Sequence, residues 1–427
     1  METNREMVNS GIPWIGDIPM EWNNAKYRYS GIFIKGKLPN EQNVEQLGKP
    51  IIGASEMLGR EFRNFSIDEN VPTCQKEDVL ILWDGTNAGF VANNCEGIVS
   101  STVVKYVCTD KKFDTKYLFY LLKNGESFFK SKVNGTTIPH MSPKYIDEYL
   151  CVQPPLDEQQ RIAEFLDRKC GEIDEMIALQ EKLIEELKAY KQSVITEAVT
   201  KGLNPAAPMR DSGIEWIGQI PEHWKIEPLK YNFNRRSERN NPIITTERLS
   251  LSIDKGVTLY SEKTTNLDRF KENFTQYQLA YPNDIVLNCM NMIVGAVGLS
   301  KYLGCVSPVY YVIYPSNCKV DSEYYSYMLN APTIRGVYYS YGKGIYAIER
   351  GEGRVNTCRL KVSYDDFGRL DIPIPPIEEQ KNIVSYIKEK CANIDSLIQT
   401  KQSKIDSLKE YKKSIIYEYV TGKREVE

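Results

Sequence analysis

Two stretches of the chain carry apolar residues at helical spacing. From Leu156 to Thr200, apolar side chains recur at steps that are mostly three, four or seven residues, and a stretch near the C-terminus repeats the pattern. Each stretch follows a Pro-Pro pair, and proline is tolerated at the very start of a helix. The pattern predicts two amphipathic helices of about 45 residues, each about 67 Å long at ~1.5 Å per residue.

The chain contains much of its own sequence twice. Residues Asn9–Trp22 and Asp211–Trp224 are identical at nine of fourteen positions. A second pair, Pro154–Gln159 and Pro375–Gln380, matches at an offset of 221, and this match continues along both helical stretches. The repeats hold four of the five tryptophans and one matched pair of tyrosines: Trp14, Trp22, Trp216, Trp224, Tyr190 and Tyr411. We interpret the chain as one fold used twice.

The duplication also suggests how the helices are paired. A lone amphipathic helix of this length needs a partner for its apolar stripe, and its nearest partner is its own copy. Because each helix follows an equivalent domain, a pseudo-two-fold arrangement would pair them antiparallel. The alternative is that each helix packs back on its own domain.

The segments between the repeats are less alike and predict strands with a few helices. Asp114 and Asp321 each precede a short helix as N-caps. Strand-like runs occur at Val79–Trp83, Val99–Val107, Ile285–Leu287 and Val309–Tyr314. We expect an α/β fold of the mixed α+β kind, with a twisted sheet in each of two pseudo-repeated domains and a coiled coil of two long antiparallel helices separating them. The expected boundaries are 1–153 for the first domain, 154–202 for the first helix, 203–374 for a linker and the second domain, and 375–427 for the second helix.

Composition narrows the class of protein. A net charge of −3 argues against a protein that coats DNA non-specifically. We therefore expect contacts with DNA phosphates to come from small basic patches or from a partner. Ten cysteines without a Cys-x-x-Cys pair indicate reduced thiols, and two histidines make a zinc site improbable. The most apolar stretch, Ile285–Leu299, is shorter than the ~20 residues of a membrane span. With no signal-peptide core at the N-terminus, we expect a cytoplasmic protein without membrane contact.

Catalytic motifs are missing from the sequence. It contains no Asn/Asp-Pro-Pro-Tyr tetrapeptide of the methyltransferase kind, and no glycine-rich nucleotide-binding loop follows a strand. The triplets Glu186–Lys188 and Glu410–Lys412 fit half of a nuclease motif, but both lie on helices rich in lysine and glutamate, where such triplets arise by composition. We therefore expect no catalytic residue, no metal and no cofactor in this chain.

The order of the repeats resembles that of the specificity subunits of Type I restriction–modification systems. The resemblance rests on Trp14–Pro19 with Trp22, on the copy Trp216–Trp224, on the two Pro-Pro-x-x-Glu-Gln helix starts, and on the ending Glu418–Lys423. It implies two target recognition domains, each reading one half of a bipartite, asymmetric sequence in double-stranded DNA. It also implies that the helices set the distance between the halves and dock two modification (methyltransferase) subunits, which restriction (translocase and nuclease) subunits then join. S-adenosylmethionine, ATP and Mg²⁺ are expected on those partners.

DNA contacts are expected from two polar loops in each domain. Arg and Lys read guanine, Asn and Gln read adenine, and other polar groups hold phosphates. The candidates in the first domain are Thr86, Asn87, Lys132, Asn134, Thr136, Thr137, His140 and Lys144. The candidates at matching places in the second domain are Asn288, Asn291, Tyr339, Tyr341, Lys343, Arg350 and Arg354. For each single residue an ordinary solvated turn is the alternative, and His140 is interpreted as a hydrogen-bonded loop residue rather than a catalyst.

The repeated aromatic residues form a second candidate set. We interpret the four tryptophans as anchors of the chain against the helix pair, with contact to the modification subunit as the second interpretation; Tyr190 and Tyr411 belong to the same structural or partner-binding set. Two other functions compete with DNA reading. A coiled-coil adaptor that bridges proteins would not need strand-rich domains with variable loops, and a self-contained DNA enzyme would need the missing motifs.

Overall fold

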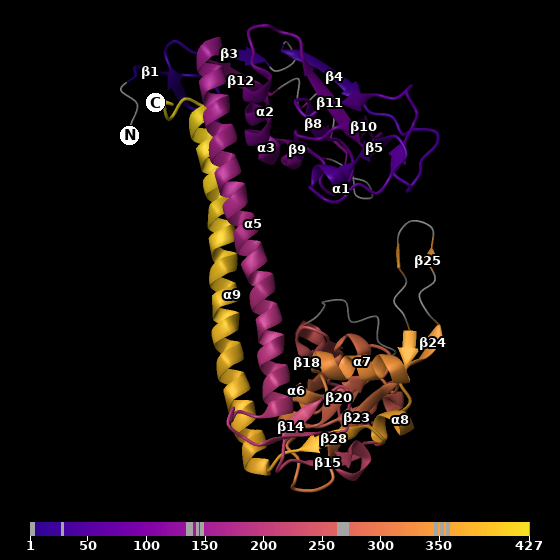
Figure 1. The fold of residues 1–427 in the computed structure, drawn as a ribbon. Helices are drawn as coiled ribbons and strands as arrows, with labels where there is room; N and C mark the ends of the chain where they lie inside the picture. Colours follow the sequence, from indigo (N-terminus) through magenta and orange to yellow (C-terminus); the bar gives the residue numbers. More distant parts are fainter. Residues whose placement is uncertain are drawn as a thin grey trace. The chain divides into compact units, whose positions relative to one another are not determined.

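The computed structural model describes residues 5–26, 30–133, 140–141, 145, 149–262, 273–345, 349–350, 354–355 and 359–426. It consists of two compact units. The first unit comprises Met1–Glu181 and Gln402–Glu427, and the second comprises Lys182–Lys401. The long helices α5 (Leu156–Lys201) and α9 (Ile377–Val420) each pass through both units (Figure 1). Each unit therefore holds one domain and a part of both helices.

The two helices pair antiparallel within each unit. In the first unit the rings of Phe165 and Tyr419 are 4.3 Å apart, and Lys412 Nζ lies 2.6 Å from the Asp174 carboxylate. Early residues of α5 thus meet late residues of α9. In the second unit, Lys191 Nζ lies 2.7 Å from Asp395, which pairs the late part of α5 with the early part of α9. The predicted antiparallel pair is confirmed, and the lengths of 46 and 44 residues agree with the expected 45.

Each helix also packs on a domain, so the alternative arrangement is present as well. In the first unit, Ile162 and Leu166 of α5 and Ile415 and Val420 of α9 belong to the domain's hydrophobic core. The core of the second unit includes residues from the end of α5 and from the start of α9: Ile195, Ala198, Val199, Ile383, Val384 and Ile387. Every domain is therefore built on the start of its own helix and on the end of the other helix.

Two four-stranded sheets form the body of the first domain (Figure 1). The first has the order β4 (Gly31–Lys35), β11 (Val103–Cys108), β8 (Val79–Leu82), β9 (Val91–Ala92). The second has the order β6 (Phe65–Ser66), β5 (Lys49–Ile52), β10 (Gly97–Val99), β7 (Thr73–Cys74). Two-stranded ladders pair β1 (Met7–Asn9) with β2 (Asp17–Pro19), and β3 (Asn23–Lys26) with β12 (Leu150–Gln153). The described helices of the domain are α1 (Ala54–Met57), α2 (Thr115–Asn124) and α3 (Glu126–Ser131).

The second domain repeats the first sheet of the first domain. Its four-stranded sheet has the order β16 (Phe233–Arg235), β23 (Tyr310–Pro315), β20 (Ile285–Asn288), β21 (Val297–Leu299). Its described helices of four or more residues are α6 (Ser322–Met328), α7 (Pro332–Tyr341) and α8 (Tyr364–Gly368). Its two-stranded ladders are β13 (Met209–Asp211) with β14 (Gln219–Pro221), β15 (Lys225–Pro228) with β28 (Asp371–Ile374), β17 (Leu249–Ser252) with β18 (Gly256–Leu259), β19 (Gln278–Ala280) with β22 (Gly304–Val306), β24 (Lys343–Ile345) with β27 (Arg359–Lys361), and β25 (Glu349–Arg350) with β26 (Arg354–Val355).

A buried glutamine joins each domain to its long helix in the same way. Gln159 is fully buried; its Oε1 accepts from Asp114 N at 2.9 Å, and its Nε2 donates to the carbonyls of Lys112 and Pro154. Gln380 makes the equivalent three bonds to Asp321 N, Lys319 O and Pro375 O. The side chains of Asp114 and Asp321 in turn cap α2 and α6, as the sequence predicts. The duplicated sequence thus encodes a duplicated polar joint.

One predicted strand is wrong. The run Val99–Val107 is not a single strand, because β10 ends at Val99 and β11 begins at Val103 in the other sheet. Val103 N donates to Ser100 O at 3.0 Å and closes a turn between them. Each domain accordingly has several small sheets rather than the one twisted sheet expected. Ser and Thr tolerate turns as well as strands, so apolar patterning does not reveal this break.

Candidate nucleic-acid interface

In the first unit, the two expected loops meet at one surface. The backbone of Asp84 forms an isolated bridge with His140, and Met141 N donates to Trp83 O at 3.0 Å. His140 Nδ1 is hydrogen-bonded to the Asp84 carboxylate, while half of the His140 side chain remains exposed. Because the carboxylate fixes the ring, His140 presents its other nitrogen in a defined direction. From the sequence, His140 is interpreted as a hydrogen-bonded loop residue, and the bond to Asp84 agrees with this interpretation.

The turn after β8 places the other candidates of this surface. Gly85 has φ +99°, a left-handed conformation that suits glycine, and Ala88 N donates to Gly85 O at 3.0 Å. Thr86 and Asn87 are exposed at the tip. Lys132 is exposed at the end of α3, with its Nζ 5.5 Å from the centre of the Phe128 ring. Four further candidates lie outside the described residues: Asn134, Thr136, Thr137 and Lys144.

The second unit uses the same backbone connection at the matching place. Val362 N donates to Cys289 O at 3.1 Å, as Met141 N does to Trp83 O in the first unit. Asn288 ends β20, and its Oδ1 accepts from Met290 N at 3.1 Å, so this oxygen holds a turn. Asn291 is exposed in that turn. Of the two asparagines, Asn291 therefore has the more accessible side chain.

A basic hairpin follows α7 in the second unit. The register pairs Lys343 with Lys361 and Ile345 with Arg359 in the β24–β27 ladder, and Arg350 with Arg354 in the β25–β26 ladder. The β24–β27 ladder lies beside α7 (Figure 1), and the β25–β26 ladder lies between its two strands in the sequence. The side chains of Arg350, Arg354 and Arg359 lie outside the described part. Sequence reasoning did not name Lys361, which the structure places directly opposite Lys343 in this ladder.

Two candidate tyrosines precede this hairpin. Tyr339 and Tyr341 are both exposed near the end of α7. Tyr341 borders a hollow of about 580 Å³ together with Trp216, Thr333 and Arg369. Tyr341 therefore lines the same hollow as a repeated tryptophan.

The repeated tryptophans contact the helix pair and the domain cores. Trp22 is buried, and its Nε1 donates to Glu158 Oε2 at 3.0 Å in the first turn of α5. Trp224 is also buried, but its Nε1 has no hydrogen-bond partner among the described residues. Trp14 stacks on Tyr149 with ring centres 5.2 Å apart. Tyr190 and Tyr411, by contrast, are exposed on the two helices.

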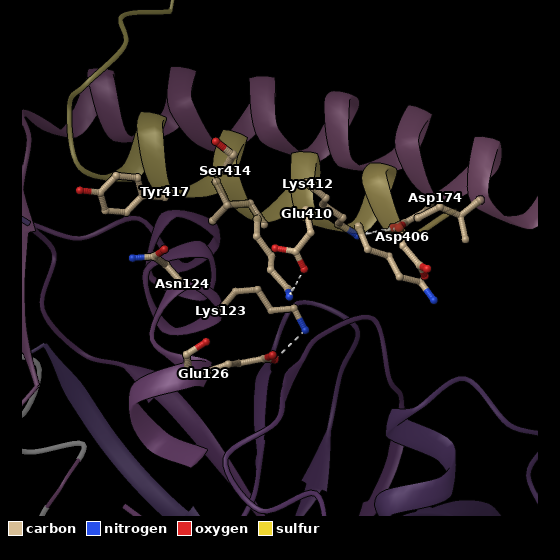
Figure 2. A pocket seen from close by; sticks show the side chains of 14 residues that line it. Lys123, Asn124, Glu126, Asp174, Asp406, Glu410, Lys412, Ser414 and Tyr417 are labelled. Carbon is tan, nitrogen blue, oxygen red and sulfur yellow. Dashed lines mark hydrogen bonds and ion pairs between the residues drawn. The ribbon is translucent and has the colours of Figure 1, made fainter. Parts of the chain in front are cut away.

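A hollow of about 820 Å³ lies in the first unit between α2, α3 and the helix pair (Figure 2). Its lysines are mostly paired: Lys123 with Glu126, Lys412 with Asp174 and Lys413 with Glu410. Burial lowers the pKa of Lys123, and Glu126 opposes that change. Because its positive charges are largely neutralised, this hollow is a poor site for phosphate.

The described residues form neither a metal site nor a membrane-spanning helix. Among them, no group of three or more His, Cys, Asp or Glu side chains could hold a metal ion. Within the same residues, no helix combines the length and the apolar character that crossing a membrane requires.

Comparisons with known proteins agree with one another. The family model described as "Type I restriction modification DNA specificity domain" matches residues 19–189. The MjaVIII specificity subunit of Methanocaldococcus jannaschii is 29% identical over 87% of this chain and 86% of its own length. The EcoDI specificity subunit of Escherichia coli is 20% identical over 83% and 82%. A chain of a solved type I restriction–modification assembly has a TM-score of 0.63 at 15% identity, covering 95% of this chain and 99% of that one, which shows a common fold.

Proposed function

We infer, from the premise that this chain belongs to the Type I restriction–modification specificity subunits, how its parts divide the reading of DNA. The chain is the non-catalytic, sequence-recognising subunit of such an enzyme. We propose that the first domain reads one half of a bipartite target and the second domain reads the other half. Methyl transfer and cleavage then belong to partner subunits, which carry S-adenosylmethionine, ATP and Mg²⁺, and the assembly acts in the cytoplasm.

One observation carries the proposal of two separate readers. The backbone bonds from Met141 to Trp83 and from Val362 to Cys289 fix a pair of loops at the same place in each domain. The side chains displayed there differ: a carboxylate-held histidine with Thr86 and Asn87 in the first domain, and asparagines with a basic hairpin in the second. Equivalent scaffolds with unlike hydrogen-bonding groups suit two unlike half-sites.

The helix pair offers surfaces for two equal partners. Met176 and Tyr411 are exposed in the first unit, and the residues at the repeated positions, Leu397 and Tyr190, are exposed in the second. Large apolar side chains on an otherwise charged coiled coil indicate contact with another protein. We propose that one modification subunit docks on each unit, that restriction subunits join this complex, and that the helices fix the half-site spacing.

Genome-wide adenine methylation tests the proposal directly. Cells would express this chain with its cognate modification subunit, each protein alone, and a hybrid chain whose residues 225–374 come from a relative with a different target. We expect a bipartite motif only when both proteins are present, and a change in one half of it with the hybrid. A change in both halves would contradict separate readers. No motif from an intact complex would favour the adaptor.

A further inference from the structure

Two adjacent arginines at the end of β16 have opposite environments. Arg236 makes a two-point ion pair with the buried Asp284, with Nε–Oδ2 at 2.6 Å and Nη2–Oδ1 at 3.0 Å. Neighbouring residues of a strand point to opposite faces, so Arg235 faces the other way. Its guanidinium lies 5.1 Å from the ring centre of Tyr311 and 4.7 Å from that of Tyr364. The two rings hold the Arg235 guanidinium in place.

Arg235 carries a charge that the described protein does not neutralise. It is exposed, and it takes part in none of the ion pairs found among the described residues. Burial raises the pKa of Tyr311, and the nearby carboxylate of Asp365, which is itself exposed at the start of α8, adds to that rise. An aromatic-stacked guanidinium without a carboxylate is ready to bind an incoming anion.

The hairpin adds two more cations at the same place. Lys343 and Lys361 are exposed and stand directly opposite each other in the β24–β27 ladder, where like charges destabilise pairing. Lys361 precedes Val362, whose carbonyl accepts from Tyr311 Oη at 2.8 Å under Arg235. Burial raises the pKa of Cys289, and the charges of Lys361 and Arg235 both oppose that rise, so both cations lie near the candidate loop.

We propose that Arg235, Lys343 and Lys361 form a phosphate-binding cluster that positions the DNA backbone of the second half-site. A backbone phosphate relieves the repulsion between the two lysines and meets a guanidinium that is already oriented. This inference rests on the proposed reading of DNA by the second domain, and it assigns the cluster to positioning rather than to base reading.

The first domain supplies a natural control for this cluster. The sheets β4-β11-β8 and β16-β23-β20 have the same order, and their registers place Phe33 where the second domain has Arg235. Phe33 contacts Tyr106 at 5.1 Å between ring centres. An Arg235→Phe variant therefore places at this position the side chain that the first domain already carries there, and it removes the positive charge.

The test measures binding of a fluorescent duplex to the complex of this chain with its modification subunits. The duplex carries the target sequence identified by the genome-wide methylation experiment, and the salt concentration is varied from about 50 to about 200 mM. The salt slope is the steepness with which the logarithm of the binding constant falls with the logarithm of the salt concentration. One phosphate contact adds about 0.9 to this slope, which is about a 3.5-fold loss of affinity over that range. We expect Arg235→Phe to reduce the slope by about 1, and the variant that also carries Lys343→Ala and Lys361→Ala to reduce it by about 2 to 3. Arg235→Lys should keep the wild-type slope, as should Lys319→Ala, which removes an exposed lysine beside the start of α9.

The outcomes separate this inference from the proposed function. If the complex binds its target specifically but the Arg235→Phe and triple variants keep the wild-type slope, the cluster does not bind phosphate, although the reading function stands. If even the wild-type complex shows no preference for the target, the reading function itself fails. Loss of slope together with an unchanged unfolding temperature supports the cluster.

Discussion

The two domains share a framework and differ in the surface built on it. Both have the same four-strand order, a capped helix and a buried glutamine that reaches the start of a long helix. At one equivalent sheet position the first domain has Phe33 in an aromatic contact, and the second has Arg235 with an uncompensated charge. The second domain also carries the basic hairpin. The shared strand order, caps and glutamines hold each domain to its long helix, whereas Arg235 and the basic hairpin give the second domain a different surface.

The buried glutamines give the most severe test of the shared framework. Gln159→Leu or Gln380→Leu removes three hydrogen bonds and leaves one backbone N–H and two carbonyls unpaired in a buried place. At about 1–3 kcal/mol for each unsatisfied group, we expect a local loss of at least about 3 kcal/mol. Hydrogen exchange read by mass spectrometry should show the loss in α2 for the first variant and in α6 for the second. An effect in only one unit would break the equivalence of the two joints.

The long helices and the capped helices of each domain could be predicted because short-range sequence patterns determine them. Helical spacing, the Pro-Pro starts and the caps Asp114 and Asp321 each act within a few residues, so the sequence reveals them directly. The turn at Ser100 and the pairing of β10 and β11 with different sheets depend on contacts distant along the chain. For the candidate sites, the loop positions were predicted, but Arg235 was not. Its role depends on Tyr311 and Tyr364, which are far from it in sequence.

The aspartate that precedes β8 in the first domain and β20 in the second has a different ion-pair partner in each domain. Asp78 pairs with Lys105 of β11, whereas Asp284 pairs with Arg236, which follows β16, and the Asp284 side chain is 3% exposed against 21% for Asp78. Arg236→Met leaves a buried carboxylate with only the Tyr281 N–H, so we expect a loss of about 3 kcal/mol. Lys105→Met should cost about 1 kcal/mol, because water can solvate Asp78. Urea unfolding of the purified chain, monitored by hydrogen exchange in β8 and β20, measures both.

A second substitution checks the cause of that difference. Asp284→Asn added to Arg236→Met removes the unpaired charge, and it should recover part of the stability lost. Asp78→Asn added to Lys105→Met should change little. Equal costs for the two single variants would show that burial of the aspartate does not set the strength of these pairs.

The paired tryptophans give the smallest and most specific comparison. Trp22 and Trp224 occupy repeated positions and are both buried, but only the Trp22 Nε1–H has a partner, the Glu158 carboxylate at 3.0 Å. In the second unit the equivalent Glu379 lies 2.8 Å from His223 Nε2 instead.

Tryptophan to phenylalanine removes similar ring area at both sites, so the difference between the variants isolates the N–H. We expect Trp22→Phe to cost about 2 kcal/mol more than Trp224→Phe, since bonds to charged groups contribute about 1.5–3 kcal/mol and an unpaired buried N–H is itself unfavourable. Hydrogen exchange near the starts of α5 and α9 would measure the two losses. Adding Glu158→Gln should shrink the gap, and a gap that persists unchanged would assign the effect to ring packing rather than to this hydrogen bond.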